Sequence, residues 1–218
     1  MIDAHFHRRV FDTFMEGEGR AVRFLGVHPW QVDADFAVAD AALATMAAKL
    51  AEDGKLAVGE IGLDRLHRPD AAAFARQREI FEKQLELAAR FSRPVVLHGA
   101  KCWGEVVKCC LPYKGIIPSF LFHGFSRSAG LIGDIVRLNG FISVGPAVVN
   151  EHAVNYRAMV AELPPDRVLV ETDLADDDSA LEREAVLSGV YEEFALLRGL
   201  SVPELAAEIT ANASRFIV

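Results

Sequence analysis

The chain has 218 residues, of which 51% are hydrophobic and 25% charged, and its formal net charge is −8. This acidic balance, with no basic stripe, counts against a dedicated nucleic-acid binder, although bound metal cations could supply the positive charge that a nuclease needs. The three cysteines are odd in number and two are adjacent, which argues against a disulfide framework. We expect one domain spanning residues 1–218.

Nothing in the sequence indicates a membrane protein. No uninterrupted apolar run reaches the roughly 18 residues that a membrane span requires. The first five residues, Met-Ile-Asp-Ala-His, do not form a signal peptide. We therefore expect a cytoplasmic protein with no membrane partner.

Short apolar segments alternate with longer amphipathic ones along the chain. The apolar segments are rich in Val, Ile, Leu and Phe at both odd and even positions, which is typical of strands buried on both faces of a parallel sheet. They predict strands at residues 2–7, 22–27, 56–61, 94–98, 119–123, 140–144 and 167–172. The amphipathic segments predict helices at residues 35–53, 71–91, 102–111, 128–138, 151–162, 179–197 and 202–216. Asp70 and Gly199 supply a helix start and a helix stop signal.

Repeated strand–helix alternation predicts an α/β fold, either a (β/α) barrel or a doubly wound sheet. No Gly-x-Gly-x-x-Gly follows the first strand, so a dinucleotide-binding fold has no support. Only residues 8–21 separate the first two predicted strands, and they show weak helical periodicity. We expect a distorted, TIM-like barrel of seven strands that lacks one βα unit near the N-terminus.

Six residues of the kinds that bind metals fall near the C-terminal ends of five predicted strands. They are His5, His7, Glu60, His98, His123 and Asp173. Alternate residues of a strand share a face, so both imidazoles of the first strand point the same way. The C-terminal ends of parallel barrel strands meet at one face, where barrel active sites are built. Closure of the barrel would bring the first and last strands together at a metal centre.

Each of these residues also has a structural interpretation. A lone histidine at a strand end is more often a hydrogen-bonded core or rim residue than a ligand. A carboxylate that follows an apolar strand is harder to explain without a partner, because its burial is costly. The argument for a metal centre therefore rests on the six residues together. His28 also follows a predicted strand. It could bind an anionic group of the substrate, or it could donate a hydrogen bond to one of the metal ligands.

In these motifs the sequence resembles the TatD family of metal-dependent hydrolases, a group of amidohydrolase-like metallo-barrels. The matching segments are Asp3-Ala-His5-Phe-His7, Gly26-Val-His28-Pro29, Val58-Gly-Glu60-Ile-Gly62-Leu-Asp64, Gln77 to Gln84, Pro94-Val-Val-Leu-His98, His123-Gly-Phe-Ser and Glu171-Thr-Asp173. Their order and approximate spacing agree from residue 3 to about residue 173, and Asn212 and Phe216 resemble the family's ending.

The resemblance implies two divalent metal ions as cofactors. It implies that His5, His7 and Asp173 hold one ion, that His98 and His123 hold the other, and that Glu60 bridges them. Mixed His and carboxylate ligands suit Zn, Mn, Fe or Co better than Mg, but the identity of the ions stays open among these five.

The metal ions would activate a water for attack on a phosphodiester, and the substrate would be DNA or a short nucleotide. Asp173 and Glu60 are the predicted catalytic residues, with Asp173 as the proton acceptor. His28 and Lys101 are predicted to bind the substrate phosphate. Lys101 stands near the position after His98 where many family members have Arg, and a Lys there is typical of a compact branch of the family.

Two other functions stay open at this point. The same metal centre could hydrolyse amides or esters, or the chain could be a metal-binding scaffold with little catalysis. Retention of all six candidate ligands argues against the scaffold, because a buried charge cluster is expensive to keep without a use. Salt-sensitive binding to DNA would distinguish a nuclease from an amidase.

Overall fold

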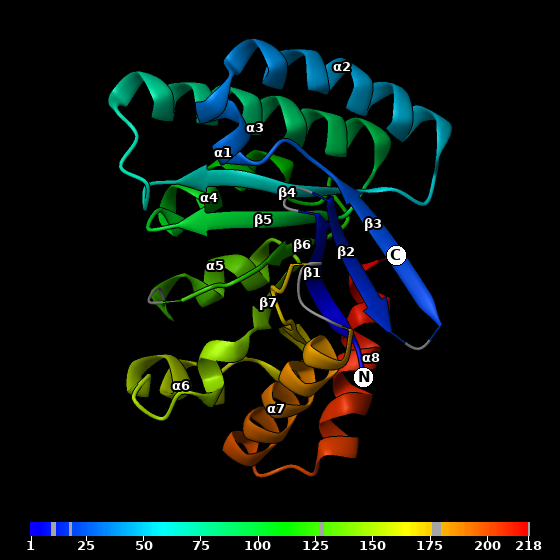
Figure 1. Cartoon of the computed structure of the whole chain (residues 1–218), viewed down its shortest axis with the longest axis vertical. Helices are drawn as coiled ribbons and strands as arrows, with labels where there is room; N and C mark the ends of the chain where they lie inside the picture. Colours follow the sequence, from blue (N-terminus) through cyan, green and yellow to red (C-terminus); the bar gives the residue numbers. More distant parts are fainter. Residues whose placement is uncertain (10–11, 18, 127–128, 176–179, 218) are drawn as a thin grey trace.

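The computed structural model of the chain describes residues 1–9, 12–17, 19–126, 129–175 and 180–217. Figure 1 shows a curved sheet with helices outside it. The strands are β1 (Asp3–Arg9), β2 (Asp12–Gly17), β3 (Arg20–Leu25), β4 (Ala57–Asp64), β5 (Val95–Ala100), β6 (Phe120–Phe122), β7 (Gly140–Val144) and β8 (Val168–Val170). They pair in chain order, and every pair from β3 onward is parallel.

Most helices follow the predicted pattern. They are α1 (Pro29–Ala34), α2 (Phe36–Glu52), α3 (Ala71–Phe91), α4 (Trp103–Cys110), α5 (Ile132–Arg137), α6 (Val154–Ala161), α7 (Ala180–Arg198) and α8 (Val202–Phe216). Short 3-10 helices lie at Leu111–Tyr113, Ala129–Leu131, Pro146–Val149 and Pro165–Arg167. Residues 128 and 179, at which two predicted helices begin, are outside the described residues. None of the described helices combines the length and apolar character that a bilayer span requires.

The prediction of seven strands is wrong, because residues 12–17 form the additional strand β2. Its side chains alternate, with Thr13 and Met15 buried and Phe14 and Glu16 partly exposed, as in a strand with one buried face. β2 pairs antiparallel with both β1 and β3. Antiparallel neighbours need only a tight connection, whereas parallel neighbours need a crossover, usually a helix. The described residues between β1 and β3 contain no helix, so a strand takes the place of the missing helical crossover.

The barrel closes where β1 meets the segment that follows β8. The backbone N–H of His7 donates to the carbonyl of Leu174 at 2.8 Å, and the N–H of Asp173 donates to the carbonyl of His5 at 3.0 Å. The buried Asp3 carboxyl accepts the Thr172 N–H at 3.0 Å and bonds its hydroxyl at 2.8 Å. These bonds join the first strand to the last part of the barrel, so the eight-stranded sheet is nearly closed.

The central strands owe their position to burial on both faces. Every residue of β4 is buried, and so are all residues of β6, β7 and β8. Outside the sheet, α3 packs on β4, α4 on β5, α5 on β7, and α7 and α8 on β8. Burying apolar area of this extent supplies most of the drive to fold. The polar residues Glu60, His123 and Asp173 are therefore carried on fully buried strands or just after them.

Helix α3 carries the polar side chain of Gln84 on its buried face. The helix begins after Asp70, whose carboxylate accepts the Ala73 N–H at 2.7 Å, and it ends at Ser92 in a left-handed conformation. The Gln84 amide bonds both backbone groups of Val27, at 2.6 Å to the N–H and 3.1 Å to the carbonyl. The helix thereby holds the loop that leads to His28.

We expect Gln84→Leu to lower the free energy of unfolding by about 3 kcal/mol, because the buried N–H and carbonyl of Val27 lose their partner. Chemical denaturation would measure this change. Glu86→Leu, at an exposed position of the same helix, is the control and should change stability by less than about 0.5 kcal/mol. Equal stabilities of the two variants would contradict this account of the Gln84 amide.

Candidate metal centre

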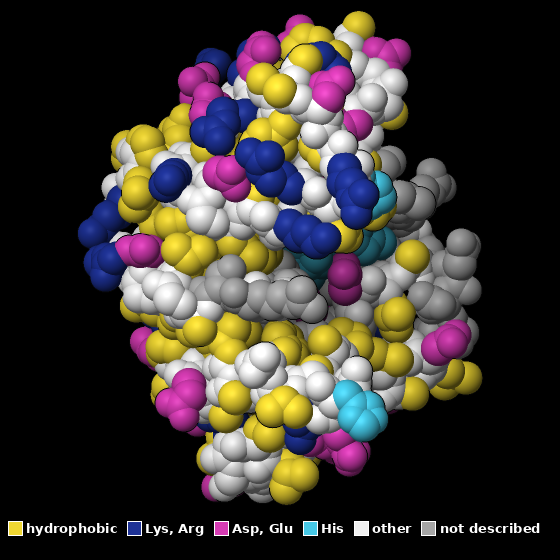
Figure 2. All heavy atoms as spheres, turned by 90° about the vertical axis from the view of Figure 1, so that its left-hand side faces the viewer, with side chains coloured by type: hydrophobic (Ala, Val, Ile, Leu, Met, Phe, Trp, Pro, Cys, Tyr) yellow, Lys and Arg dark blue, Asp and Glu magenta, His cyan; other side chains and the backbone are white. Residues whose placement is uncertain are grey.

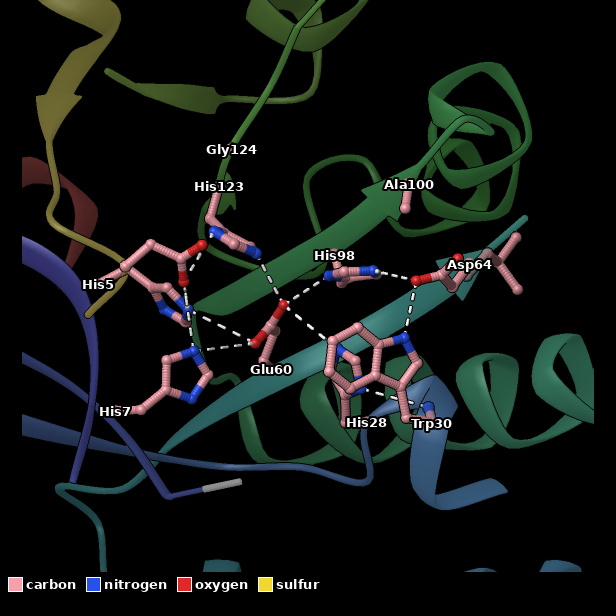
Figure 3. Close-up of polar contacts among 12 residues, drawn as sticks. His5, His7, His28, Trp30, Glu60, Asp64, His98, Ala100, His123 and Gly124 are labelled. Carbon is pink, nitrogen blue, oxygen red and sulfur yellow. Dashed lines mark hydrogen bonds and ion pairs between the residues drawn. The ribbon is translucent and has the colours of Figure 1, made fainter. Parts of the chain in front are cut away.

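Glu60 lies at the centre of the polar residues at the strand ends (Figure 3), with its side chain almost fully buried. Its two carboxylate oxygens face different histidines. Oε1 lies 2.7 Å from His98 Nδ1 and 2.7 Å from His123 Nε2. Oε2 lies 3.5 Å from His5 Nε2 and 3.8 Å from His7 Nε2. One carboxylate therefore stands between two pairs of imidazoles.

Asp173 completes the cluster on the side of β1. Its Oδ1 lies 3.3 Å from His7 Nε2 and 3.6 Å from His5 Nε2, and its side chain is 46% exposed. Donor atoms of His5, His7 and Glu60 lie within 4.8 Å of one another, and so do those of His5, His123 and Asp173. The structure thus brings together all six residues that the sequence singled out, from β1, β4 and β5 and from the ends of β6 and β8.

Several of the buried nitrogens lack the hydrogen bonds that burial normally requires. Among the described residues, both ring nitrogens of His5 and the Nδ1 atoms of His7 and His123 have no hydrogen-bond partner. An unpaired buried polar group costs roughly 1–3 kcal/mol. The separations of 3.5 and 3.6 Å between His5 Nε2 and the two carboxylates are long for hydrogen bonds and leave room for a cation between these groups. The donor set fits a divalent transition metal.

The charges of the cluster reinforce one another. Burial alone would raise the pKa of Glu60, but the neighbouring histidines, His123 first, hold this pKa well below its usual range. Burial would lower the pKa of His123 and His98, but Glu60 and the other nearby carboxylates raise both. The pKa of His7 is raised against burial by Asp173 and Glu60. The cluster is therefore an ionised carboxylate site that attracts positive charge.

Two further carboxylates stand behind the histidines. Asp64 Oδ2 lies 3.1 Å from His98 Nε2, the nitrogen that faces away from Glu60. Glu171 lies 3.7 Å from His123 Nδ1 through Oε2, and its Oε1 accepts the Gly124 N–H at 2.8 Å. A carboxylate on the remote nitrogen orients a metal-binding imidazole and raises its basicity.

Neither carboxylate was predicted from the sequence to belong to the site. Asp64 and Glu171 appeared only as letters within matching motifs. A usable sequence signal was present, since each is a carboxylate at the end of an apolar strand or just after it.

His28 belongs to this cluster more closely than the sequence indicated. It caps α1, a short helix that the sequence analysis missed, and its Nδ1 accepts the Trp30 backbone N–H at 3.2 Å. A neutral His28 therefore carries its proton on Nε2, which lies 3.5 Å from Glu60 Oε1. Burial lowers the pKa of His28, which favours this neutral form. His28 thus presents an N–H group to the centre.

Lys101 lies apart from the cluster, on the wall of the adjoining cavity. This cavity has a volume of about 740 Å³, and His98, His123 and Asp173 also line it. The Lys101 side chain is exposed. Figure 2, which faces the C-terminal ends of β4 and β5, shows histidines in a hollow that Lys and Arg side chains border. The approach to the cluster is therefore positively charged on one side, although the whole chain is acidic.

Comparison with known proteins identifies the family. The sequence matches the family described as "TatD related DNase" over residues 2–217. The chain belongs to this family. This TatD-related chain is 29% identical over 195 residues to YcfH of Escherichia coli K12, an uncharacterized metal-dependent hydrolase, and the match covers 87% of the chain and 71% of YcfH.

Two further relatives link the family to a fold and to an activity. The crystal structure of YjjV, a TatD homolog from Escherichia coli K12, has a TM-score of 0.77 at 28% identity and covers 89% of this chain and 75% of YjjV. The 3'-5' ssDNA/RNA exonuclease TatD of Erwinia tasmaniensis is 29% identical over 181 residues, which is 77% of this chain and 68% of that protein. The resemblance drawn from the sequence is confirmed, and this TatD-family chain is a metal-dependent hydrolase with a nearly closed α/β barrel.

We expect Asp64→Asn to weaken metal binding roughly 10- to 100-fold. An Asn amide group in place of Oδ2 would point N–H groups at both His98 Nε2 and the Trp30 indole N–H, where one carboxylate oxygen now accepts, and the opposite rotamer would point them at the Leu66 N–H. Isothermal titration with Zn²⁺ or Mn²⁺ would measure the loss. Asp40→Asn, at an exposed ion pair with Lys83, is the matched control. Unchanged affinity in Asp64→Asn would show that Asp64 does not support His98.

We expect metal affinity to rise as the pH is raised through and above about 6.5, the ordinary pKa of histidine. The raised pKa values of His7, His98 and His123 mean that these rings hold protons at the lower pH and must lose them before they bind a metal. Glu60 stays ionised throughout this range. Titration calorimetry in buffers of different ionisation enthalpy would count the released protons. Metal affinity that is independent of pH would contradict the raised histidine pKa values.

Proposed function

We propose that this protein hydrolyses phosphodiester bonds in DNA or short nucleotides at a centre of two divalent metal ions. The observation that supports it most is the division of the Glu60 carboxylate, with Oε1 toward His98 and His123 and Oε2 toward His5 and His7. A carboxylate shared in this way is suited to bridging two cations, and paired cations are common in enzymes that cleave phosphate esters.

The proposed ligands fall into two sets. His5, His7 and Asp173 would hold one ion, His98 and His123 the other, and Glu60 both. Divalent ions in such a site lower the pKa of water and neutralise charge on phosphoryl oxygens. Asp64 and Glu171 would keep His98 and His123 in position through their remote nitrogens.

Asp173 is the candidate for proton transfer. Its side chain is half-exposed toward the pocket, whereas Glu60 is buried. Burial would raise the pKa of Asp173, but His123 and His7 lower it, so the Asp173 carboxylate is ionised at neutral pH. It can accept a proton from the attacking water and return it to the leaving oxygen. Glu60, with both oxygens directed at histidines, is placed to hold the centre together.

The surroundings favour an anionic substrate. His28 directs an Nε2–H group into the centre, and we assign it to a phosphoryl oxygen of the substrate. Lys101 stands on the wall of the adjoining cavity, where an ammonium group attracts phosphate over a longer range. The relative from Erwinia tasmaniensis is named as an exonuclease on ssDNA and RNA. A nucleic-acid strand or a short nucleotide therefore fits the site best.

We expect the chelator-stripped protein to regain turnover of bis(p-nitrophenyl) phosphate when Mn²⁺, Zn²⁺, Co²⁺ or Mg²⁺ is added. Glu60→Gln should lower this turnover by roughly 1000-fold or more, because the amide cannot bridge two cations as a carboxylate does. Glu79→Gln, at an exposed position of α3, is the control.

The assay also separates the alternative functions. If protein that holds metal shows no turnover of phosphodiesters but cleaves an ester or amide, the metal centre serves that other hydrolysis. If it cleaves none of these substrates, the proposed activity fails and the scaffold interpretation gains support.

A further inference from the structure

The side chain of Trp30 is open to solvent within a polar pocket. It is 39% exposed, although it lines the pocket that contains Glu60 and His98. The other tryptophan, Trp103, is 6% exposed and packs against Phe122 and Phe125 in the core. An indole left open on the wall of a polar pocket retains apolar area that a ligand could cover.

The Trp30 ring is held in one position despite its exposure. Its Nε1–H donates to Asp64 Oδ2 at 2.8 Å, and Asp64 is itself fully buried. The other oxygen of Asp64 accepts the backbone N–H groups of Leu66 at 2.6 Å and His67 at 3.2 Å. Gln77 accepts the Asp64 N–H at 2.9 Å. The indole is thus fixed through a carboxylate that is anchored from three sides.

Neighbouring rings also restrict Trp30. The His28 ring meets it edge to face, with centroids 4.8 Å apart and an interplanar angle of 83°. The His67 ring lies 4.7 Å away at 47°. Figure 3 shows the indole beside His28 and below the line from Glu60 to Asp64. An aromatic group that is already immobilised loses little conformational entropy when a ligand stacks on it.

Fixing His98 does not account for all of this arrangement. The indole N–H helps to fix Asp64, which in turn contacts His98. This role requires only a hydrogen-bond donor, and it does not require the large exposed ring that carries the donor. The ring centroid lies 6.3 Å from that of His98, so a group stacked on the indole would be close to the proposed metal ligands.

We propose that Trp30 is a stacking subsite for a planar ring, the base of the nucleotide whose phosphate lies at the metal centre. The subsite rests on the proposed function, because the phosphate places the base. Every base has a flat π face, so stacking on an indole tolerates many sequences. The subsite would distinguish nucleotides from phosphate esters that carry no ring.

The test compares dTMP with deoxyribose 5-phosphate, which has the same sugar and phosphate but no base. Calorimetry on the metal-loaded protein should give an affinity for dTMP roughly tenfold higher than for deoxyribose 5-phosphate. Trp30→Leu should weaken binding of dTMP by about the same factor and leave deoxyribose 5-phosphate little changed. Trp30→Phe keeps an aromatic face without the N–H, and it should retain most of the preference for dTMP.

A fluorescence measurement provides a second readout that does not depend on turnover. Stacking of dTMP should quench the exposed Trp30, and Trp30→Phe should abolish this quenching because Trp103 is buried. Metal content is measured for every variant. If Trp30→Leu does not fold or load metal, the wild type and Trp30→Phe still decide between the outcomes.

The outcomes separate the subsite from the proposed function. Equal affinity of the wild type for the two phosphates, or equal weakening of both in Trp30→Leu, overturns the stacking subsite and leaves phosphodiester hydrolysis standing. Quenching and a preference for dTMP in a protein that cleaves no phosphodiester would support the subsite and overturn the proposed reaction.

Discussion

The buried carboxylate of Glu60 is the constraint on which the rest of the site depends. An ionised carboxylate inside a protein is unstable unless positive charge or hydrogen-bond donors surround it. Its oxygens lie within 3.8 Å of nitrogens from five histidines, namely His5, His7, His28, His98 and His123. These rings come from different strands and loops, so the barrel must deliver all of them to one point. The same crowding lowers the pKa of Glu60 and raises that of His123, which makes the centre a site for cations.

Barrel closure is the second requirement, because the cluster joins the first strand to the last. His5 and Asp173 are far apart in the sequence, yet their backbones are hydrogen-bonded and their side chains lie 3.6 Å apart. The chain meets this requirement with an antiparallel strand, Asp12–Gly17, in place of a βα unit. A shorter connection near the N-terminus therefore leaves intact the arrangement of the strand ends that carry the six polar residues.

Behind the cluster, hydrogen bonds run from helix α3 to the site. Gln84 holds the loop before His28, and Gln77 holds the end of β4 at Asp64. Asp64 then contacts both His98 and Trp30. The orientation of the His98 imidazole and that of the exposed indole thus depend on the same buried carboxylate. Groups held in this way lose little freedom when a substrate binds, which favours precise placement.

The sequence by itself determined the α/β alternation and most helices, and it placed the six clustered polar residues near strand ends, because burial pattern and strand-end position are local properties of the chain. Tertiary structure decided the rest. The strand at residues 12–17 was not recognisable, since its weak alternation has meaning only beside β1 and β3. The roles of Asp64 and Trp30 likewise depend on contacts across the barrel that no spacing in the sequence encodes. The sequence could place ligands at one face, but only closure and packing decided which oxygen of Glu60 faces which histidine.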